Sequence, residues 1–575
     1  MLNGLPLNSA ALNALWQLSI TPPEPVAAPT SLVWACRVRL GVENVSAQLT
    51  GKVRIEREEG AAAIAELSLY LPEAGVDVVG WTGRPLEIYF QHLVDGVWVE
   101  ERRFSGWLEQ PTYDPRNRIV ACEATDRLQD LVEAMEIDAI DLLAGGVWSE
   151  DVFEALDGRS RWDYAMERMG TLPASLDRSV AGALRVTPWA RKAPIKVFGP
   201  GTTIDQSLSV EIAKLSDRVN RVELSIDYRY SRLRQRSYSY SWQHPDIEGW
   251  SESQGFCLWR HNTTELPTID MITDALSSAG LHSMGGSFLT VPLSGVYCDP
   301  PQGWTNQFDN LVLAFGVAGG VRWVQPITEK YVLTVEAPPS IAQAGEVIRR
   351  DGTAVESELD RADNWESEDF STTEPDAVID ELGDAVINLR EPERLSLAIR
   401  CQLATSAASI LSAHRGTRVG FQVPTSMALG IDLVHTVRLE DRCTAEGKTW
   451  SIIDELDIDN QTAISTLTLA ISRGGGEAAD PLLPPAPPAT NPGGPVPAPP
   501  FFSTQLRGRG LMTYDDEREG FAGNYDEVDA GTPVDPFPRR LQMTAPDIPA
   551  EQRDEYTAEK TATYRVAIPD DPLVL

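Results

Sequence analysis

Alternating apolar and polar residues dominate two separate parts of the chain. Over residues 31–125, the segments WACRVRL, KVRIERE, AELSLYL and LEIYFQHL place apolar side chains at every second position. This period is typical of strands with one buried face. Asp95-Gly96 between two such segments indicates a tight hairpin. The pattern returns over residues 395–475, with LSLAIRCQL, TRVGFQV, TWSIID and ISTLTLAIS. We therefore predict an antiparallel sheet curled into a barrel in each part.

A longer pattern is shared by the two parts. Residues 104–125 and 447–472 each run from an aromatic strand through an Asp/Asn turn into an alternating strand, with Trp107 and Trp450 in comparable places. This is a weak internal repeat of all-β character. It predicts two similar β-barrels in one polypeptide, an arrangement that lets a trimer present six equivalent barrels.

Helical signals lie between the two predicted barrels. Thr125 precedes an apolar face carrying Leu128 and Val132, and Ser149 and Ser160 are in positions to cap the segments SEDVFEAL and RWDYAMERM. Further on, PTIDMITDALSSAG begins with Pro at a permitted first-turn position and ends at a Gly. We predict helices at all four places.

The predicted fold class is mainly β with α insertions: two similar antiparallel β-barrels plus an intervening α+β region. The predicted divisions are an extended leader at 1–30, the first barrel at 31–125, a helical insert at 126–215, an intervening α+β region at 216–394 that includes the first strands of the second barrel and an acidic loop, the second barrel at 395–475, a Pro-rich linker at 476–503 and an acidic extended tail at 504–575. Whether residues 130–345 form one domain or two stays open at this point.

Charge is distributed unevenly along a strongly acidic chain. The formal net charge is −35, which argues against tight binding to a phosphate backbone because such binding needs clustered Lys and Arg. The clearest basic cluster contains Arg229, Arg232, Arg234 and Arg236. It is interpreted either as an exposed hairpin tip or as a surface that docks onto an acidic neighbour. One such neighbour is the segment 351–384, with thirteen acidic residues and one Arg. This segment is in turn either a solvated loop or a functional acidic surface.

No pattern of catalytic or metal-binding residues stands out. The six His residues are dispersed, and the six Cys residues include no CxxC pair. Phosphate-binding, dinucleotide-binding and nucleophile-elbow motifs are absent from the sequence. We therefore expect a protein that is not an enzyme and has no cofactor. We also expect no membrane segment, because no continuous apolar run is long enough to span a bilayer.

Several strings resemble one family. They are LNGLPLNSAALNA, LTGKVRIERE, AIAELSLYL, FSGWLEQ, WDYAMERMGTLPASLD, FGPGTTIDQSLSVEIAKLSDRVNRVELSIDYRY and TLTLAISRGGG. Together they resemble the tail hub, or baseplate hub, proteins of tailed bacteriophages, of the Mu-like or long non-contractile-tail type. The resemblance covers about residues 1–475. The Pro-rich linker and acidic tail are outside it.

The resemblance implies a homotrimer whose two tail-tube-like antiparallel β-barrels per subunit make a pseudo-sixfold ring. Such a ring would adapt the sixfold tail tube to the threefold tail tip and surround the DNA exit channel. The implied partners are further copies of the chain, the distal tail protein or tail tube, the tape-measure protein and a central fibre or spike. Genome DNA would pass through the lumen without specific binding, which suits an acidic wall. The implied location is the tail tip of a virion assembled in the host bacterial cytoplasm.

Two other functions compete with the hub interpretation. A tail-associated cell-wall hydrolase would need an acid/base site, most plausibly within 130–340. A receptor-binding tip protein would use exposed aromatic residues such as Trp242, Trp250 and Trp259. Clearing of peptidoglycan would identify the first, and binding of the isolated protein to cells the second.

Overall fold

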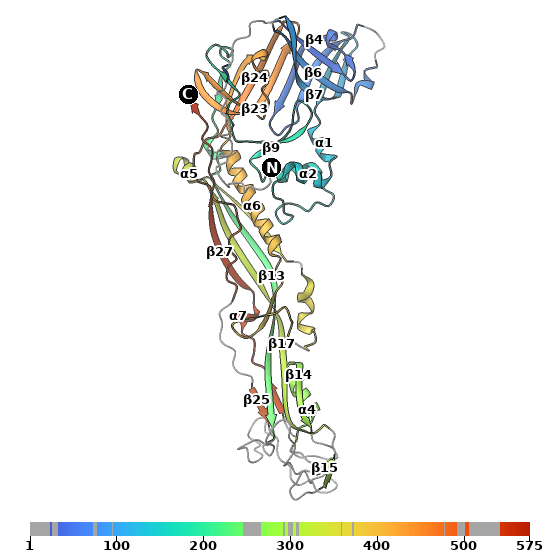
Figure 1. Ribbon diagram of the computed structural model, residues 1–575, viewed down its shortest axis with the longest axis vertical. Coiled ribbons are helices and arrows are strands. Elements are labelled where there is room, and N and C mark those ends of the chain that lie inside the picture. Colours follow the sequence, from blue (N-terminus) through green and yellow to red (C-terminus); the bar gives the residue numbers. More distant parts are fainter. Residues whose placement is uncertain are drawn as a thin grey trace.

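The chain folds into a β-rich head from which a long, narrow shaft extends (Figure 1). The structure is a computed structural model. It describes residues 24–25, 33–72, 77–94, 96–244, 266–290, 294–296, 303–305, 310–357, 359–370, 373–476, 478–491, 501–504 and 541–575. The fold is mainly β with α insertions, which confirms the predicted class. Except for the short strand β1 (Glu24–Pro25), the predicted leader lies outside the described residues.

The first half of the head is an antiparallel sheet that we call the first unit. Its strands are β2 (Trp34–Leu40), β3 (Glu43–Asn44), β4 (Leu49–Glu58), β5 (Ile64–Tyr70), β6 (Pro85–Val94), β7 (Val97–Asp114) and β8 (Ile119–Thr125). They are ordered β4-β5-β8-β7-β6-β2-β3. Alternate residues of β2, β5 and β8 are buried, as the period-two pattern predicts. Gly96, with a φ of 79°, supplies the positive dihedral angle that the β6–β7 hairpin needs.

The other half of the head, the second unit, is assembled from distant parts of the chain. Its strands are β11 (Lys196–Phe198), β12 (Ser209–Glu211), β21 (Thr417–Pro424), β22 (Thr436–Asp441), β23 (Cys443–Asp457) and β24 (Thr462–Ile471). They are ordered β12-β21-β24-β23-β22-β11. The two outermost strands thus come from within the predicted helical insert, 126–215, rather than from 395–475.

The two units are curved parts of one continuous sheet of fifteen strands. Strand β23 of the second unit pairs with β4 of the first, which makes the sheet continuous. Among the described residues, no ladder joins β2 or β3 back to β4, so the first unit is open rather than a closed barrel.

One predicted strand of the second barrel is wrong. The segment LSLAIRCQL belongs to the helix α6 (Pro392–Ala413), which packs against the shaft strands below the head (Figure 1). Its first residue is Pro, which the first turn of a helix tolerates because no backbone donor is needed there. Leu395, Ile399 and Leu403 recur at a spacing of four and are all buried, so a helical face explains the apolar run better than a strand does.

The helical insert is partly as predicted. It contains α1 (Leu128–Glu133), α2 (Ile137–Ala144), α3 (Arg161–Met169) and a hairpin of β9 (Ala174–Arg178) and β10 (Leu184–Pro188). Ser160 caps α3 by accepting a hydrogen bond from the backbone N–H of Asp163. The predicted helix after Ser149 is wrong. Its residues form turns, and Thr353 and Arg394 bind the backbone oxygen and carboxylate of Asp151 instead.

Two long strands form the shaft. β13 (Arg221–Gln243) and β17 (Val312–Glu336) pair along the whole of β13. Further strands flank this pair: β14 (His282–Thr290), β18 (Ile348–Glu356), β19 (Val378–Ile379), β20 (Ala385–Asn388) and β27 (Tyr556–Arg565). The remaining strands and helices are α4 (Ile269–Ser278), β15 (Ser294–Val296), β16 (Gly303–Thr305), α5 (Pro338–Ala344), β25 (Phe501–Thr504), β26 (Leu541–Thr544) and α7 (Ala550–Arg553). Five 3₁₀ turns span Ser46–Gln48, Val79–Trp81, Leu215–Asp217, Asp360–Ser367 and Thr425–Met427.

The end of the chain is an integral part of the shaft. β27 lies parallel to β17, and the last strand, β28 (Leu573–Val574), pairs with β23 in the head. Tyr564, Val566 and Ile568 are buried in the shaft core together with Leu482 from the Pro-rich segment. Residues 541–575 therefore run back toward the head along the shaft (Figure 1), and an extended tail is the wrong description for them.

Candidate assembly surface

The internal repeat corresponds to two hairpins with the same turn. In the first unit, the carboxylate of Asp114 accepts a hydrogen bond from the side-chain amide of Asn117 at 2.7 Å, and in the second unit Asp457 accepts one from Asn460 at 2.9 Å. Both Asp residues also accept backbone N–H donors of the turn. Asp and Asn favour such turns because their short side chains can satisfy the turn backbone. The Asp/Asn pattern in the sequence therefore has the same physical cause in both hairpins.

Both hairpins also carry a β-bulge on the first strand. In β7 the register slips between Leu108 and Gln110, and in β23 it slips between Thr449 and Ser451. The residue that ends each turn has a positive φ, 55° at Arg118 and 54° at Gln461. A bulge bends a strand and increases its twist. The two sheets therefore curve by the same device.

The bulge in β23 marks a change of neighbour. Before the bulge, β23 pairs with β22, ending at Lys448 opposite Thr436. Beyond it, residues 451–457 pair with residues 52–58 of β4 while still pairing with β24 on the other side. We call this pairing of β23 with β4 the internal joint. It fixes one curved sheet beside the other within a single subunit.

Buried ion pairs reinforce the internal joint. Arg103 of β7 donates two hydrogen bonds, of 2.9 and 3.1 Å, to the fully buried carboxylate of Asp454 on β23. Glu59, just after β4, binds Lys448 at 3.0 Å and the guanidinium of Arg415 at 3.0 and 3.1 Å. Burial by itself would raise the pKa of Glu59, but these two cations outweigh it and lower the pKa to about 2. Glu59 is therefore ionised at neutral pH and binds two buried cations.

The predicted arginine cluster lies in the middle of β13 and not at a hairpin tip. Arg232, Arg234 and Arg236 are buried, whereas Arg229 is exposed and only 3.5 Å from Glu356. Arg234 and Arg236 bind the buried carboxylate of Asp384 at 2.9 and 2.6 Å. The interpretation of these residues as an exposed tip is wrong, because neighbouring carboxylates compensate the charges inside the shaft.

The arginine cluster also binds the returning parts of the chain. Arg232 donates to the backbone oxygen of Thr490 at 2.7 Å, and Arg236 donates to the side-chain oxygen of Gln552 at 2.7 Å. The docking partners that the structure gives these arginines are thus segments of the same chain. Docking of a second chain at Arg229, Arg232, Arg234 or Arg236 stays a prediction.

The acidic segment 351–384 packs closely on the shaft. The indole of Trp365 is buried and donates to the backbone oxygen of Arg234 at 3.0 Å. The guanidinium of Arg322 lies 4.2 Å from the centre of the same ring. A purely solvated loop is therefore the wrong description of this segment, because part of it contributes to the core.

A cluster of exposed apolar residues covers the end of the β6–β7 hairpin. Val94 is 41%, Val97 65%, Trp98 49% and Val99 45% exposed. Apolar side chains gathered in this way on a surface are typical of interaction sites. This patch is therefore a surface suited to assembly.

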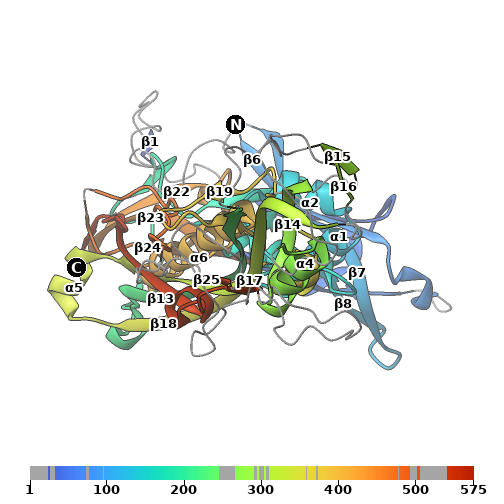
Figure 2. The same cartoon turned by 90° about the horizontal axis from the view of Figure 1, so that it is seen from below.

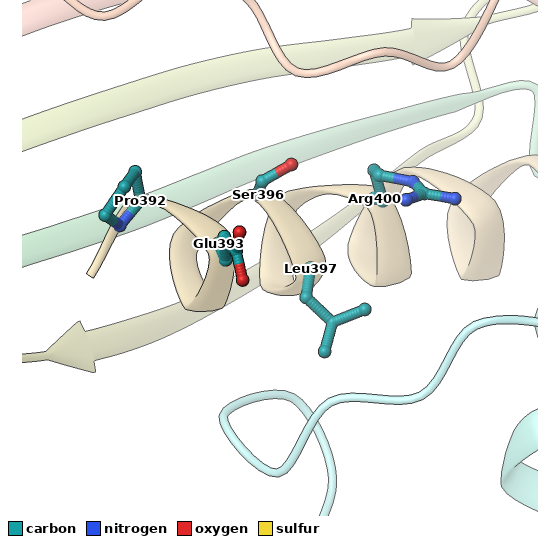
Figure 3. Close-up of a pocket in the computed structure, with 5 residues that line it drawn as sticks. All are labelled: Pro392, Glu393, Ser396, Leu397 and Arg400. Atoms are coloured by element: carbon teal, nitrogen blue, oxygen red, sulfur yellow. The ribbon is translucent and has the colours of Figure 1, made fainter.

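The described part of the chain offers little concave surface for chemistry. Figure 3 shows an open hollow of about 440 Å³ whose five lining side chains, Pro392, Glu393, Ser396, Leu397 and Arg400, all come from α6. Among the described residues, no group of three His, Cys, Asp or Glu side chains could hold a metal ion. This hollow therefore gives no indication of a catalytic function.

The tryptophans proposed as a receptor-binding surface do not form one in the described part of the chain. Trp242 is buried and stacks on Phe315 with ring centres 6.2 Å apart. Trp250 and Trp259 lie outside the described residues. The sequence could not place Trp242, because large aromatic rings serve cores and interfaces equally well.

One described helix, α6, is long and apolar enough by length and composition to cross a membrane. In its most apolar window, 67% of the residues are buried inside the protein. This burial is typical of the core helix of a globular fold.

Comparison with solved structures finds similar chains among phage tail proteins. A tail protein from Neisseria meningitidis MC58 is 10% identical, with a TM-score of 0.35, and the match covers 76% of this chain and 96% of that one. The 43 kDa tail protein of prophage MuSo2 from Shewanella oneidensis is 11% identical, with a TM-score of 0.34 and coverages of 76% and 98%. A chain of the Francisella PdpA–VgrG complex is 6% identical, with a TM-score of 0.32 and coverages of 83% and 62%. No family model matches the sequence, and no curated protein does. Because these TM-scores are all below 0.5, we base the function on the geometry of this chain.

Proposed function

We propose that this protein is the trimeric hub of a phage-type tail, a structural protein that surrounds the DNA exit channel and joins a sixfold tube to a threefold tip. The observation that carries this proposal is the duplication of one curved sheet within the chain. The six strands of the second unit follow the same order as six of the seven strands of the first, although β11 is parallel to β22 whereas β2 is antiparallel to β6. Both units turn their main hairpin with an Asp/Asn pair and carry a bulge in it. The internal joint holds the two units edge to edge.

The proposed ring follows from this duplication. Three copies, each contributing two similar sheets, present six similar positions around one axis. An object with that symmetry can contact a sixfold tube on one face and a threefold tip on the other. The shaft extends from one side of the head (Figure 1), so in a ring of copies related by one axis the three shafts would point away from the tube.

The overall charge suits a passage for nucleic acid. A net charge of −35 disfavours adsorption of DNA, so genome DNA could move through the lumen without sticking. The exposed apolar end of the β6–β7 hairpin provides a contact for another tail component. We propose the distal tail protein or tail tube, the tape-measure protein and a central fibre or spike as partners, and the tail tip of a virion as the location.

The proposal is tested by the mass of the protein in solution and by its shape in the electron microscope. We expect the purified full-length protein to have the mass of a trimer, and class averages in the electron microscope to show a threefold ring with a central hole. A stable monomer at micromolar concentration would contradict the proposal. Clearing of peptidoglycan by the purified protein would instead favour the cell-wall hydrolase, and binding of the isolated protein to host cells would favour the receptor-binding protein.

A further inference from the structure

The two units differ in whether the edge of their fourth strand is covered by another strand. We count strands in the order in which they pair, β12-β21-β24-β23-β22-β11 in the second unit and β4-β5-β8-β7-β6-β2-β3 in the first. Strand β23 is then the fourth strand of the second unit, and its segment beyond the bulge pairs with β4, the first strand of the first unit. The corresponding fourth strand of the first unit is β7. Its pairing with β6 ends at Trp107, opposite Pro85. Among the described residues, the segment Gln110–Asp114 pairs with β8 on one side and with no strand on the other.

The corresponding first strand of the second unit also has an open edge. By position this strand is β12, which pairs with β21 as β4 pairs with β5. Within the described part of the chain, no strand covers the other edge of β12. Just beyond it, the apolar residues Ile212 and Leu215 are 57% and 52% exposed. Each subunit thus has one uncovered stretch of strand edge in each unit, on β7 in the first and on β12 in the second.

We infer that the β7 edge at Gln110–Asp114 of one copy pairs with the β12 edge at Ser209–Glu211 of the next copy. This inference rests on the proposed function and adds the strands that make the contact. The contact would repeat, between copies, the joint that β23 and β4 form within a copy. Figure 2 shows β7 and β8 of the first unit at one side of the head and β22, β23 and β24 of the second unit, to which β12 belongs, at the other.

The chemistry of the two edges indicates a shorter contact than the internal joint. β12 spans three residues, whereas β4 spans ten. Pro111 has no backbone N–H and therefore reduces the donors on the β7 edge. Apolar contact between Tyr113, which is 42% exposed, and Ile212 of the next copy would supplement the backbone hydrogen bonds. A proline on an edge also hinders pairing with unrelated strands.

The inference is tested by disulfide crosslinking of full-length protein carrying both Thr112→Cys and Ser209→Cys. Cα atoms on paired antiparallel strands lie about 4.5–5.5 Å apart, within the range that a disulfide spans. Three pairing registers are tested, so parallel samples combine Thr112→Cys with Val210→Cys or with Glu211→Cys in place of Ser209→Cys. After mild oxidation we expect covalent dimers and trimers in at least one of these pairs, and their disappearance on reduction.

Matched controls separate this contact from chance oxidation. Each single-cysteine variant reports on crosslinking through the native thiols. The pair Glu43→Cys with Ser209→Cys places one cysteine on β3, an exposed strand at the opposite end of the first unit. We expect no covalent trimer from the controls.

The possible outcomes separate this inference from the proposed function. A protein that has the mass of a trimer but gives no crosslink with any of the three pairs, or equal crosslinking in the controls, would overturn the inferred contact and leave the hub proposal standing. A protein that neither forms trimers nor crosslinks would overturn both.

Discussion

At the scale of single residues, Glu59 is a carboxylate in the head that two cations share. It binds Lys448 and Arg415, and its carboxylate also accepts a hydrogen bond from Ser175 at 2.8 Å. Both cations are buried. A buried charge that loses its partner cannot regain its hydration, which makes the loss of the shared anion more costly than the loss of either cation.

The substitution Glu59→Gln tests this asymmetry. We expect it to lower the free energy of unfolding by about 3–5 kcal/mol, because it leaves Lys448 and Arg415 buried without their anion. Lys448→Met is the matched control, because it retains the Arg415 pair, and it should cost clearly less. Urea unfolding followed by tryptophan fluorescence measures both. Equal losses for the two variants would contradict the assigned role of Glu59.

Asp571 makes the end of the chain sensitive to pH. Burial raises its pKa to about 6, although Ser472 donates a backbone hydrogen bond to it at 2.8 Å. A carboxyl whose pKa is higher in the folded than in the unfolded state stabilises folding when it takes up its proton. Its contribution to stability therefore increases as the pH falls from about 7 through 6, and it is lost as the pH rises.

We expect Asp571→Asn to remove this contribution. When the pH is lowered from 7.5 to 5.5, the free energy of unfolding measured in urea should rise less, or fall more, for the variant than for the unsubstituted protein. The exposed neighbour Asp570 offers the control Asp570→Asn, which should leave the pH dependence unchanged. Identical pH profiles for Asp571→Asn and the unsubstituted protein would contradict the assignment.

At the scale of elements, a glycine occupies the same place in each repeated hairpin, three residues before the bulge. A Cβ on Gly106 would lie 2.4 Å from the backbone oxygen of Thr125, and one on Gly447 would lie 2.5 Å from that of Ala470. The two strands can approach their partners this closely only because these residues lack side chains. The repeat therefore includes a packing constraint as well as a turn.

Gly106→Ala and Gly447→Ala should each lower the free energy of unfolding by about 1–3 kcal/mol, because the added methyl group forces the paired strands apart. Gly199 has open space around its Cβ position, so Gly199→Ala should change stability by less than about 0.5 kcal/mol. Thermal or urea unfolding provides the measurement. A neutral Gly106→Ala or Gly447→Ala variant would show that the hairpins can relax.

The arginine cluster of β13 holds several elements of the shaft together. Asp384 faces both Arg234 and Arg236, and Arg236 also reaches Gln552 in α7. Asp384→Asn should destabilise the shaft by about 3–5 kcal/mol, because two buried guanidinium groups lose their shared anion.

Hydrogen exchange around Gln552 would show whether the returning segment loosens in Asp384→Asn. Arg229→Met, which removes only an exposed ion pair, is the control and should cost about 0–1 kcal/mol. Unchanged exchange in Asp384→Asn would mean that Asp384 does not hold the returning segment in place.

At the scale of the whole molecule, the end of the chain completes the shaft rather than hanging from it. β27 covers the edge of β17 over ten residue pairs, and its neighbours fill the shaft core. An uncovered strand of that length would present a row of unpaired backbone groups and promote aggregation. The returning segment is therefore expected to be needed for a soluble shaft.

Deletion of residues 478–575 should make the shaft susceptible to proteolysis and cause the protein to aggregate, whereas the head strands should persist as a protected fragment. Light scattering and limited proteolysis measure the two effects. A shorter deletion of residues 573–575 removes only β28 and should leave the shaft protected. A protease-resistant, soluble shaft in the longer deletion would contradict the role of β27.

The sequence by itself determined the local features. Period-two alternation located the strands of the first unit, and the Asp/Asn turns revealed the repeated hairpin, because both signals depend on neighbouring residues only. Ser160 was recognised as a helix cap for the same reason. The absence of catalytic spacing also follows from the sequence, although it leaves the partners of the protein open.

Only the tertiary structure decided which distant segments share a sheet. β11 and β12 join strands more than two hundred positions further along the chain, and β27 joins β17 across a similar separation. Nothing in the alternation of a strand specifies its neighbour, because backbone pairing is the same for every sequence. The burial of Arg234 and Arg236 likewise depends on Asp384, whose position beside them is set by the pairing of β13 with β20. Local chemistry thus fixed the elements, and long-range packing fixed their partners.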